Sequence, residues 1–334
     1  MNELAFFVNN VVISGVVLGS IYAMGAIGVT LIFGILRFAH FAHGDMMTMG
    51  AFIAFVLAGV GAALGMQTGW PAGFVVLPLA MLIAAAIALG IDRLFYHPLR
   101  ERGAKPVTLL IASIGVTLMI QGLLRLFFGV ANLSFFETET KQIFRWVPPV
   151  EGLRRPITFS EPQLLLVAVT VISVIALHLF LSRTRLGKGM RATADNPALA
   201  QVSGINTRDV IRATWVIAGA LACLAGTMLA LDVTLKADLA FNIVLPIFAA
   251  AIVGGLGRPY GAIAGGFLVG FAETLAVFNW TSVLRPFGSW LPAGWALPPD
   301  LSLVPTDYKL TVAFVILVVV LLFRPTGIFK GMST

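Results

Sequence analysis

Long apolar runs with few or no charges constrain this sequence more than any other feature. Several runs reach 18 residues or more, the length that crosses roughly 30 Å of hydrocarbon. Hydrophobic residues make up 59% and charged residues 11% of the chain, against about 45–50% and about 25% in soluble proteins. The sequence therefore predicts an all-α polytopic membrane protein with about eight or nine transmembrane helices, one or two of them broken or re-entrant.

Nine apolar segments are expected to form a single transmembrane domain over residues 1–334. Their predicted bounds are 11–36, 46–65, 72–94, 107–129, 162–182, 213–233, 239–256, 261–279 and 310–323. If there are only eight crossings, 239–256 is the candidate for a re-entrant pass, because it is short and bounded by glycines.

The distribution of Lys and Arg along the sequence predicts how the chain is oriented in the membrane. Lys and Arg collect around the 97–106 connection, the 183–212 stretch and the C-terminus, and the positive-inside rule places these segments in the cytoplasm. The loops 130–161 and 281–308 then lie on the other side, where the N-terminus also lies. The net charge of +7 thus reflects membrane orientation and does not indicate a nucleic-acid partner. We expect no removable signal peptide, since the first residues contain no basic region or small-residue cleavage site.

The hydrophilic stretch 183–212 contains a short, well-capped helix. Asn196 is a side-chain cap, and Pro197 occupies the first helical position. Gly204 allows a left-handed termination, and Leu199 and Val202 lie on one face between these ends. A rigid helix pinned at both ends between two spans suits a mechanical role, although an ordinary connecting loop is the alternative.

Polar residues inside spans are candidate lining groups. Ser113, Thr117, Gln121 and Arg125 recur every four residues, so they share one helix face. Such a face is expected to contact protein or a water-filled path rather than lipid. Glu273 is an isolated acid in apolar surroundings and must also face the interior, either as a packing partner or as a lining group.

No residue pattern indicates catalysis or a cofactor. His40, His43 and Asp45 have metal-ligand character, but their spacing matches no strong zinc pattern, which favours a structural or gating role over metal binding. The Gly-Lys-Gly at 187–189 lacks the earlier glycine of a Walker loop, because Ser182 stands there. The chain is therefore expected neither to hydrolyse ATP nor to act as an enzyme.

Two broken regions, 34–50 and 254–266, place glycines and an arginine between apolar helices, and such interruptions indicate a transport path and an internal repeat.

Small residues also recur every four positions on two spans, which predicts close helix approach in lipid. These residues are Gly15, Gly19 and Ala23, and Ala262, Gly266, Gly270 and Thr274.

With these segments laid out, the chain resembles the permease subunits of branched-chain amino acid ABC importers. The resemblance is carried by GSIYAMGAIGVTLIFGILRFAHFAHGDMMTMGAF (19–52), RATADNPALAQVSGINTRDVIRATWVIAGALACLAG (191–226), IVGGLGRPYGAIAGGFLVGFAETL (252–275) and RPTGIFK (324–330). Together these segments cover most of the chain outside the two extramembrane loops.

The resemblance implies a multi-pass subunit of the bacterial inner membrane, with a periplasmic N-terminus and a cytoplasmic C-terminus. It implies four kinds of partner: a second permease subunit, identical or different, two ATP-binding cassette subunits, a periplasmic substrate-binding protein and membrane lipid. It also implies that the short cytoplasmic helix docks on an ATPase. The docking residues carried over are Asn196, Pro197, Ala198, Leu199, Ala200, Val202 and Gly204.

This sequence departs from the coupling-loop motif of ABC permeases in two places. The glutamate of the motif is absent, and Thr214, Val216 and Ile217 stand where Ile, Leu and Pro are expected.

Candidate path-lining residues are Ser113, Thr117, Gln121, His40, His43 and Glu273.

Three alternatives remain open from the sequence. A urea or short-amide ABC permease shares much of the pattern. An ATP-independent secondary transporter would need intramembrane acids or cation sites in both halves, and only Glu273 qualifies. An intramembrane enzyme would need a catalytic pair, which the residues do not supply.

Overall fold

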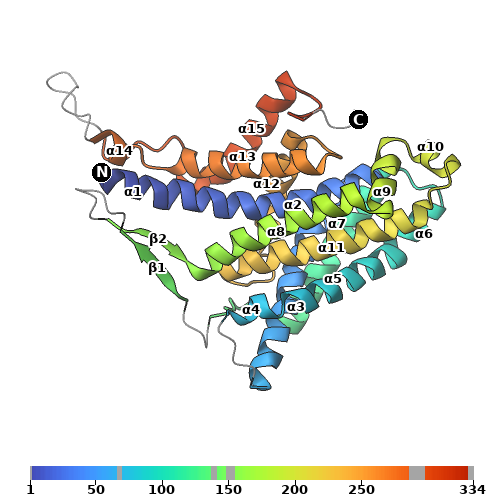
Figure 1. Ribbon diagram of the computed structural model, residues 1–334, viewed down its shortest axis with the longest axis horizontal. Helices are drawn as coiled ribbons and strands as arrows, with labels where there is room; N and C mark the ends of the chain where they lie inside the picture. The colour runs from blue at the N-terminus through green and yellow to red at the C-terminus, as the bar shows by residue number, and fades with distance from the viewer. Residues whose placement is uncertain (1, 66–69, 137–140, 148–154, 286–297, 330–334) are drawn as a thin grey trace.

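The computed structural model describes residues 2–65, 70–136, 141–147, 155–285 and 298–329. These residues form an all-α bundle with one small hairpin, shown in Figure 1. Within them, eight helices are long and apolar enough to cross a membrane. The prediction of an all-α polytopic membrane protein is confirmed.

Three of the spans join several helical segments. The first combines α1 (Asn2–Phe7), the π-helical η1 (Val8–Ile13) and α2 (Ser14–Leu36). The third combines α5 (Leu77–Ile91), the π-helical η2 (Asp92–Tyr96) and α6 (His97–Glu101). The last combines the 3-10 turn η4 (Thr306–Tyr308) and α15 (Lys309–Phe323). The other long helices are α3 (His43–Ala63), α7 (Pro106–Phe128), α8 (Glu161–Arg183), α11 (Thr207–Asp232) and α13 (Pro259–Val277).

Short elements connect the spans. They are α4 (Ala72–Val75), α9 (Arg185–Asp195), α10 (Pro197–Val202), α12 (Phe241–Gly254) and α14 (Thr281–Leu284). Strands β1 (Ile143–Trp146) and β2 (Ile157–Ser160) pair antiparallel inside the expected loop 130–161. Asn9 anchors this hairpin to the first span by accepting from the N–H of Thr158 at 3.0 Å.

Several helices extend beyond the predicted apolar bounds. The span predicted at 213–233 begins at Thr207, and the one predicted at 72–94 continues to Glu101. An ion pair of 2.7 Å between Arg100 and Asp92 lies in this extension. Hydropathy locates the part of a helix that suits hydrocarbon, whereas backbone hydrogen bonding continues into the aqueous boundary.

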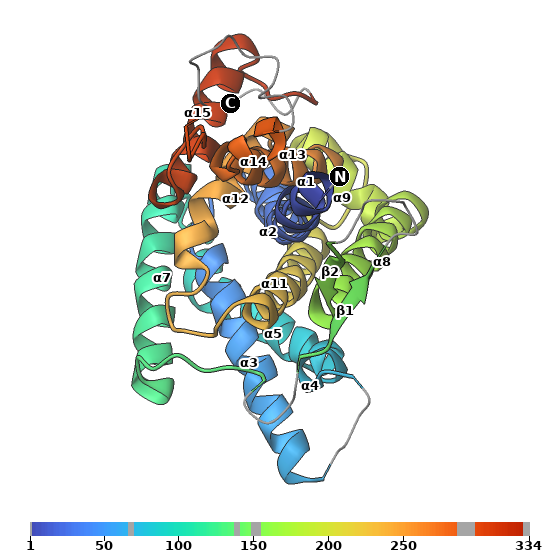
Figure 2. The ribbon, with the colours of Figure 1, turned by 90° about the vertical axis from the view of Figure 1, so that its left-hand side faces the viewer.

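The centre of the bundle is formed by α2 and α11, which are largely buried and surrounded by the other spans in Figure 2. The packing of α2 against α13 is the most extensive between any two described helices. It uses the predicted small residues, because a Cβ on Gly270 would lie 2.6 Å from the backbone nitrogen of Gly19. Such contact gains dispersion energy where lipid supplies no hydrophobic driving force between helices.

The two ends of the bundle are distinct. The hairpin end contains β1, β2 and α14, and the α10 end contains α6, α9 and α10, as Figure 1 shows. The N-terminal span begins at the hairpin end, where Asn9 contacts Pro156. Near the C-terminus, the N–H of Ile328 donates to the carbonyl of Val253 at 2.9 Å, at the α10 end of α12.

Residues 233–258 form an irregular pass between these two ends. At the hairpin end, Leu235 pairs with Leu133 in an isolated bridge. The N–H of Ala240 then donates to Oγ1 of Thr48 inside the bundle at 3.1 Å. The 14-residue α12 is too short to span alone, since its length is about 21 Å. The bridge at Leu235 and the turn 237–240 therefore precede α12 in connecting the two ends.

The two predicted broken regions meet at the α10 end. The first break follows α2, and the second is the turn 255–258 between α12 and α13, where Gly255 and Gly257 have positive φ. A Cβ on Gly34 would lie 3.3 Å from the Cα of Gly257. Close backbone contact thus joins two segments that are more than 200 residues apart in the sequence.

Candidate functional site

The short helix α10 lies between α9 and α11, and we call these two flanking helices the platform. The side chain of Asn196 accepts a hydrogen bond from the N–H of Leu199 at 3.1 Å, and Pro197 begins the helix. Gly204 follows with φ +82°, and Asn206 caps α11 by accepting from the N–H of Arg208 at 3.1 Å. The predicted capping pattern is confirmed, and it leaves the helix little freedom to fray.

One side of α10 is apolar and exposed. Leu199 is 63% exposed and Val202 is 87% exposed, whereas Ala200 is buried against the platform. Ala198 is also exposed. Leu199 and Val202 lie three residues apart, so they present one apolar edge on the outside of the helix.

Arg37 connects this platform to the first break. Its guanidinium Nη2 donates to the carbonyl of Ala194 at 2.7 Å, and its backbone is left-handed, with φ 58°. The carbonyl belongs to the last turn of α9, where a cation is favoured by the helix dipole. The α2 helix therefore ends in direct contact with the segment that carries α10.

The first break also buries two histidines. His40 and His43 are both fully buried, with ring centroids 6.4 Å apart. His40 lies edge-on to Trp215 at 5.1 Å and to Tyr96 at 5.3 Å between ring centroids. Burial holds the pKa of His40 well below its usual range, and His43 adds to the shift. His40 is therefore neutral inside an aromatic cluster.

Asp45 does not join the two histidines. Its Oδ1 accepts a hydrogen bond from Nε2 of Gln121 at 2.9 Å. Ser113 accepts a hydrogen bond from the N–H of Phe41 at 3.2 Å. Thr117, one helical turn from both Ser113 and Gln121, is also buried. Ser113, Thr117 and Gln121 of the predicted polar face thus lie along a seam between α7 and residues 41–45 at the start of α3, whereas Arg125 of that face is exposed.

Glu273 lies at a different place, on the α2–α13 interface. The hydroxyl of Tyr22 donates to its Oε2 at 2.9 Å, and Nζ of Lys309 lies 3.8 Å from the same oxygen. Glu273 is fully buried. The carboxylate therefore ties α2, α13 and α15 together.

Comparison with known proteins identifies the family. The family described as "Branched-chain amino acid transport system / permease component" matches residues 11–321. The chain belongs to this family.

Relatives in several organisms match over nearly the full length of this permease component. The permease protein LivH of the high-affinity branched-chain amino acid transport system of Escherichia coli K12 is 32% identical over 98% of this chain and 97% of its own. BraD, its counterpart in Pseudomonas aeruginosa, is 31% identical over 95% of this chain and 94% of its own. A probable LivH of Methanocaldococcus jannaschii is 26% identical over 94% and 90%.

Membership in this permease family decides between the functional alternatives. A permease component is a transport subunit, so the chain is not an enzyme. The relatives favour a branched-chain amino acid permease over a urea permease or an ATP-independent carrier. The chain is a multi-pass membrane protein that works in an assembly with other transporter subunits.

Sequence reasoning missed two groups of residues in this permease. The role of Arg37 was not predicted, because a left-handed arginine has no local sequence signature. Trp215 and Tyr96 were not assigned to the environment of His40, since they come from different spans. The apolar run that follows Trp215 in the sequence was a weak signal that it faces the interior.

Proposed function

We propose that this chain is the permease subunit of an ABC importer and forms part of the transmembrane path for branched-chain or related amino acids. It sits in the bacterial inner membrane, with the α10 end in the cytoplasm and the hairpin end in the periplasm. Its partners are a second permease subunit, two ATP-binding cassette subunits and a periplasmic substrate-binding protein.

The observation that carries this proposal is the exposure of Leu199 and Val202 on a helix capped at both ends. An apolar face of this kind fits a groove on an ATPase subunit. Because α9 and α11 hold both ends of α10, displacement of the helix by an ATPase is passed to the spans as a rigid-body movement. Packed interfaces with two stable arrangements convert such a movement into opening or closing of a path.

The distribution of cations supports the orientation. Basic residues are concentrated at the α10 end, as the positive-inside rule requires of a cytoplasmic face. They include Arg93, Arg100, Arg102, Lys105, Arg183, Arg185, Lys188, Arg191, Arg208, Arg212, Arg258 and Arg324.

The seam between α3 and α7 is the proposed path-lining element, with Ser113, Thr117 and Gln121 on one side. His40 and His43 lie at the break where this seam begins, and we assign them a gating role. Glu273 contacts three helices on the α2–α13 interface, which favours packing as its role.

Co-purification with the cognate ATPase subunits tests the proposal. Wild type should retain the ATPases, and a variant with residues 196–204 replaced by a Gly-Ser linker should lose them. The point variants Leu199→Ser and Val202→Ser should reduce retention by about tenfold each, since each removes a buried apolar contact in the complex.

Leu303→Ser is the matched control, because Leu303 is 75% exposed and lies at the hairpin end of the bundle, away from α10. Full ATPase retention by the linker variant would overturn the docking assignment, and no retention by wild type would overturn the ABC assignment. Uptake of labelled leucine and of urea by the complete transporter separates the two substrate classes.

A further inference from the structure

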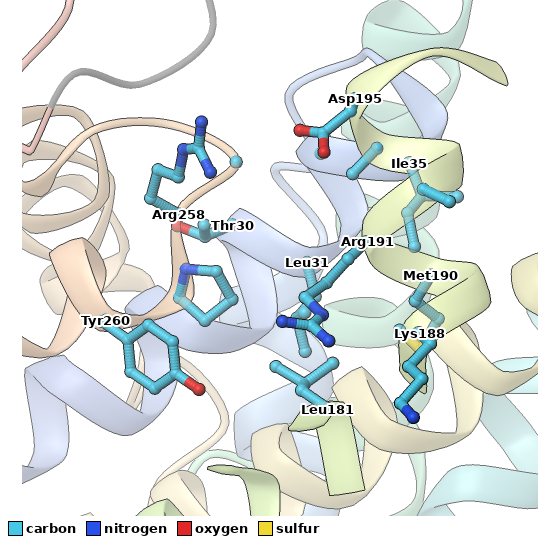
Figure 3. A pocket seen from close by; sticks show the side chains of 15 residues that line it. Thr30, Leu31, Ile35, Leu181, Lys188, Met190, Arg191, Asp195, Arg258 and Tyr260 are labelled. Atoms are coloured by element: carbon cyan, nitrogen blue, oxygen red, sulfur yellow. The ribbon is translucent and has the colours of Figure 1, made fainter. Parts of the chain in front are cut away.

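A cavity of about 420 Å³ opens at the α10 end, where the ends of four helices come together. Its walls come from the end of α2, the end of α8, the middle and end of α9, and the start of α13. Figure 3 shows Arg258 and Tyr260 on one wall and Lys188, Arg191 and Asp195 on the opposite wall. The function proposed above counts the cations among these side chains only toward the orientation and assigns a ligand to none of them.

The cavity is electropositive. Lys188, Arg191 and Arg258 line it, against the single acid Asp195. In the described parts of the chain, no ion pair engages any of these three cations. The first turn of the 19-residue α13 also borders the cavity through Pro259 and Tyr260, and a helix N-terminus carries partial positive charge. This combination suits a phosphate group.

The same cavity borders the lipid-facing surface of α8. His178 and Tyr260 form a hydrogen bond of 2.8 Å at its edge. On α8, Val171 and Ile175 are 51% and 53% exposed. They lie seven and three residues before His178, so the three residues share one face of the helix. A polar, basic cavity therefore continues into an apolar surface along the hydrocarbon.

We propose that this cavity binds the headgroup of an anionic phospholipid, whose acyl chains lie along the exposed face of α8. The phosphate accepts hydrogen bonds from Arg191 and Arg258, which approach it from α9 and α13. A cavity of this volume holds a glycerophosphate headgroup and excludes the acyl chains. Basic pockets between transmembrane helices on the cytoplasmic side are suited to such lipids.

A lipid source explains the site better than free phosphate. Leu181, Met190 and Pro259 give the cavity apolar walls, which a free, fully hydrated anion does not need. The exposed face of α8 at Val171 and Ile175 adds an apolar contact that only a molecule with acyl chains can use. The leaflet follows from the proposed orientation, but the binding itself does not depend on it.

Native mass spectrometry of the isolated chain in detergent tests the proposal without any ATPase subunit. Wild type, titrated with dioleoyl phosphatidylglycerol or dioleoyl phosphatidylcholine, should bind the anionic lipid at least tenfold more tightly. The double variant Arg191→Gln/Arg258→Gln should remove this preference. Arg191→Lys/Arg258→Lys keeps both charges and should restore most of it.

Arg208→Gln is the matched control, since it removes one exposed charge from the same end of the bundle outside the cavity. Equal preference for phosphatidylglycerol in the double Gln variant and in this control would overturn the proposal. A second arm adds 10-fold excess inorganic phosphate or glycerol 1-phosphate. Retention of bound lipid supports an acyl-chain contribution, and full displacement would reduce the site to one for a free anion and overturn the lipid assignment.

Discussion

Arg37 donates a hydrogen bond to the carbonyl of Ala194 at 2.7 Å. Among the described residues, Arg37 is the one non-glycine residue with positive φ. Ala194 lies two residues before Asn196, the cap of α10. The contact thus joins the end of α2, at the first break, to the platform that carries the proposed ATPase-docking helix.

Replacing Arg37 should uncouple transport from ATP hydrolysis. Arg37→Ala removes the hydrogen bond, which to a charged donor contributes about 1.5–3 kcal/mol, so ATP-driven uptake should fall by about tenfold or more. Binding of the ATPases should persist, because α10 itself is unchanged. Arg37→Gly should lose coupling to the same degree but be more stable than Arg37→Ala, since glycine accepts the left-handed backbone.

The control for Arg37 is Arg102→Ala, an exposed cation at the same end of the bundle. Uptake and ATPase activity of the reconstituted transporter are measured together for each variant. Normal uptake by Arg37→Ala would show that the contact with Ala194 does not transmit movement.

Gly204→Val should impair uptake without preventing membrane insertion. Gly204 has φ +82°, and a β-branched residue in that region costs at least about 1–2 kcal/mol, so the end of α10 must rearrange. Gly204→Asn should remain active, because asparagine tolerates this conformation. Wild-type uptake by the valine variant would count against a rigid docking helix.

Gly270→Leu should abolish stable folding. Its new side chain would meet the backbone of Gly19 at 2.6 Å from the first added atom, so α2 and α13 would have to separate. Gly122→Leu on α7 is the matched control, because nothing lies within 4 Å of a Cβ built at Gly122. Size-exclusion profiles and thermal denaturation in detergent compare the two. Similar behaviour of both variants would contradict the close packing of α2 on α13.

Glu273 and Tyr22 should be energetically coupled. Tyr22→Phe and Glu273→Gln should each lower the thermal denaturation midpoint. The double variant should lose about 1 kcal/mol less free energy of unfolding than the two single variants lose together. Glu273→Ala should lower the denaturation midpoint further than Glu273→Gln, since it leaves the Tyr22 hydroxyl buried without an acceptor. Strict additivity of the two conservative variants would show that their 2.9 Å contact contributes nothing.

Cysteines along the α7 seam should report water access during transport. In a background lacking Cys223, the chain's one cysteine, substitutions at Ser113, Thr117 and Gln121 should react with polar thiol reagents when the assembled transporter turns over ATP. Ile114 and Leu118, exposed on the outer face of α7, provide lipid-facing controls. Equal reactivity at seam and control positions would make the seam a packing surface and not a path.

The local capping structure could be predicted without the fold. Asn196, Pro197 and Gly204 act through hydrogen bonds and backbone angles within a few residues, so their pattern is sufficient to place a short helix. The small residues of α2 and α13 predicted a close interface for a similar reason, because in lipid only small side chains let backbones touch. Their pairing with each other still required the structure.

The sequence by itself determined the membrane class, the approximate spans and the capped helix, because hydrocarbon length and backbone chemistry act locally along the chain. Only the tertiary structure decided that Arg37 meets Ala194, that Tyr22 meets Glu273 and that Arg191 faces Arg258 across a cavity. These pairs are 157, 251 and 67 residues apart in the chain. Such contacts depend on how helices rotate and cross, which is set by the packing of all their faces together and leaves no trace in local periodicity.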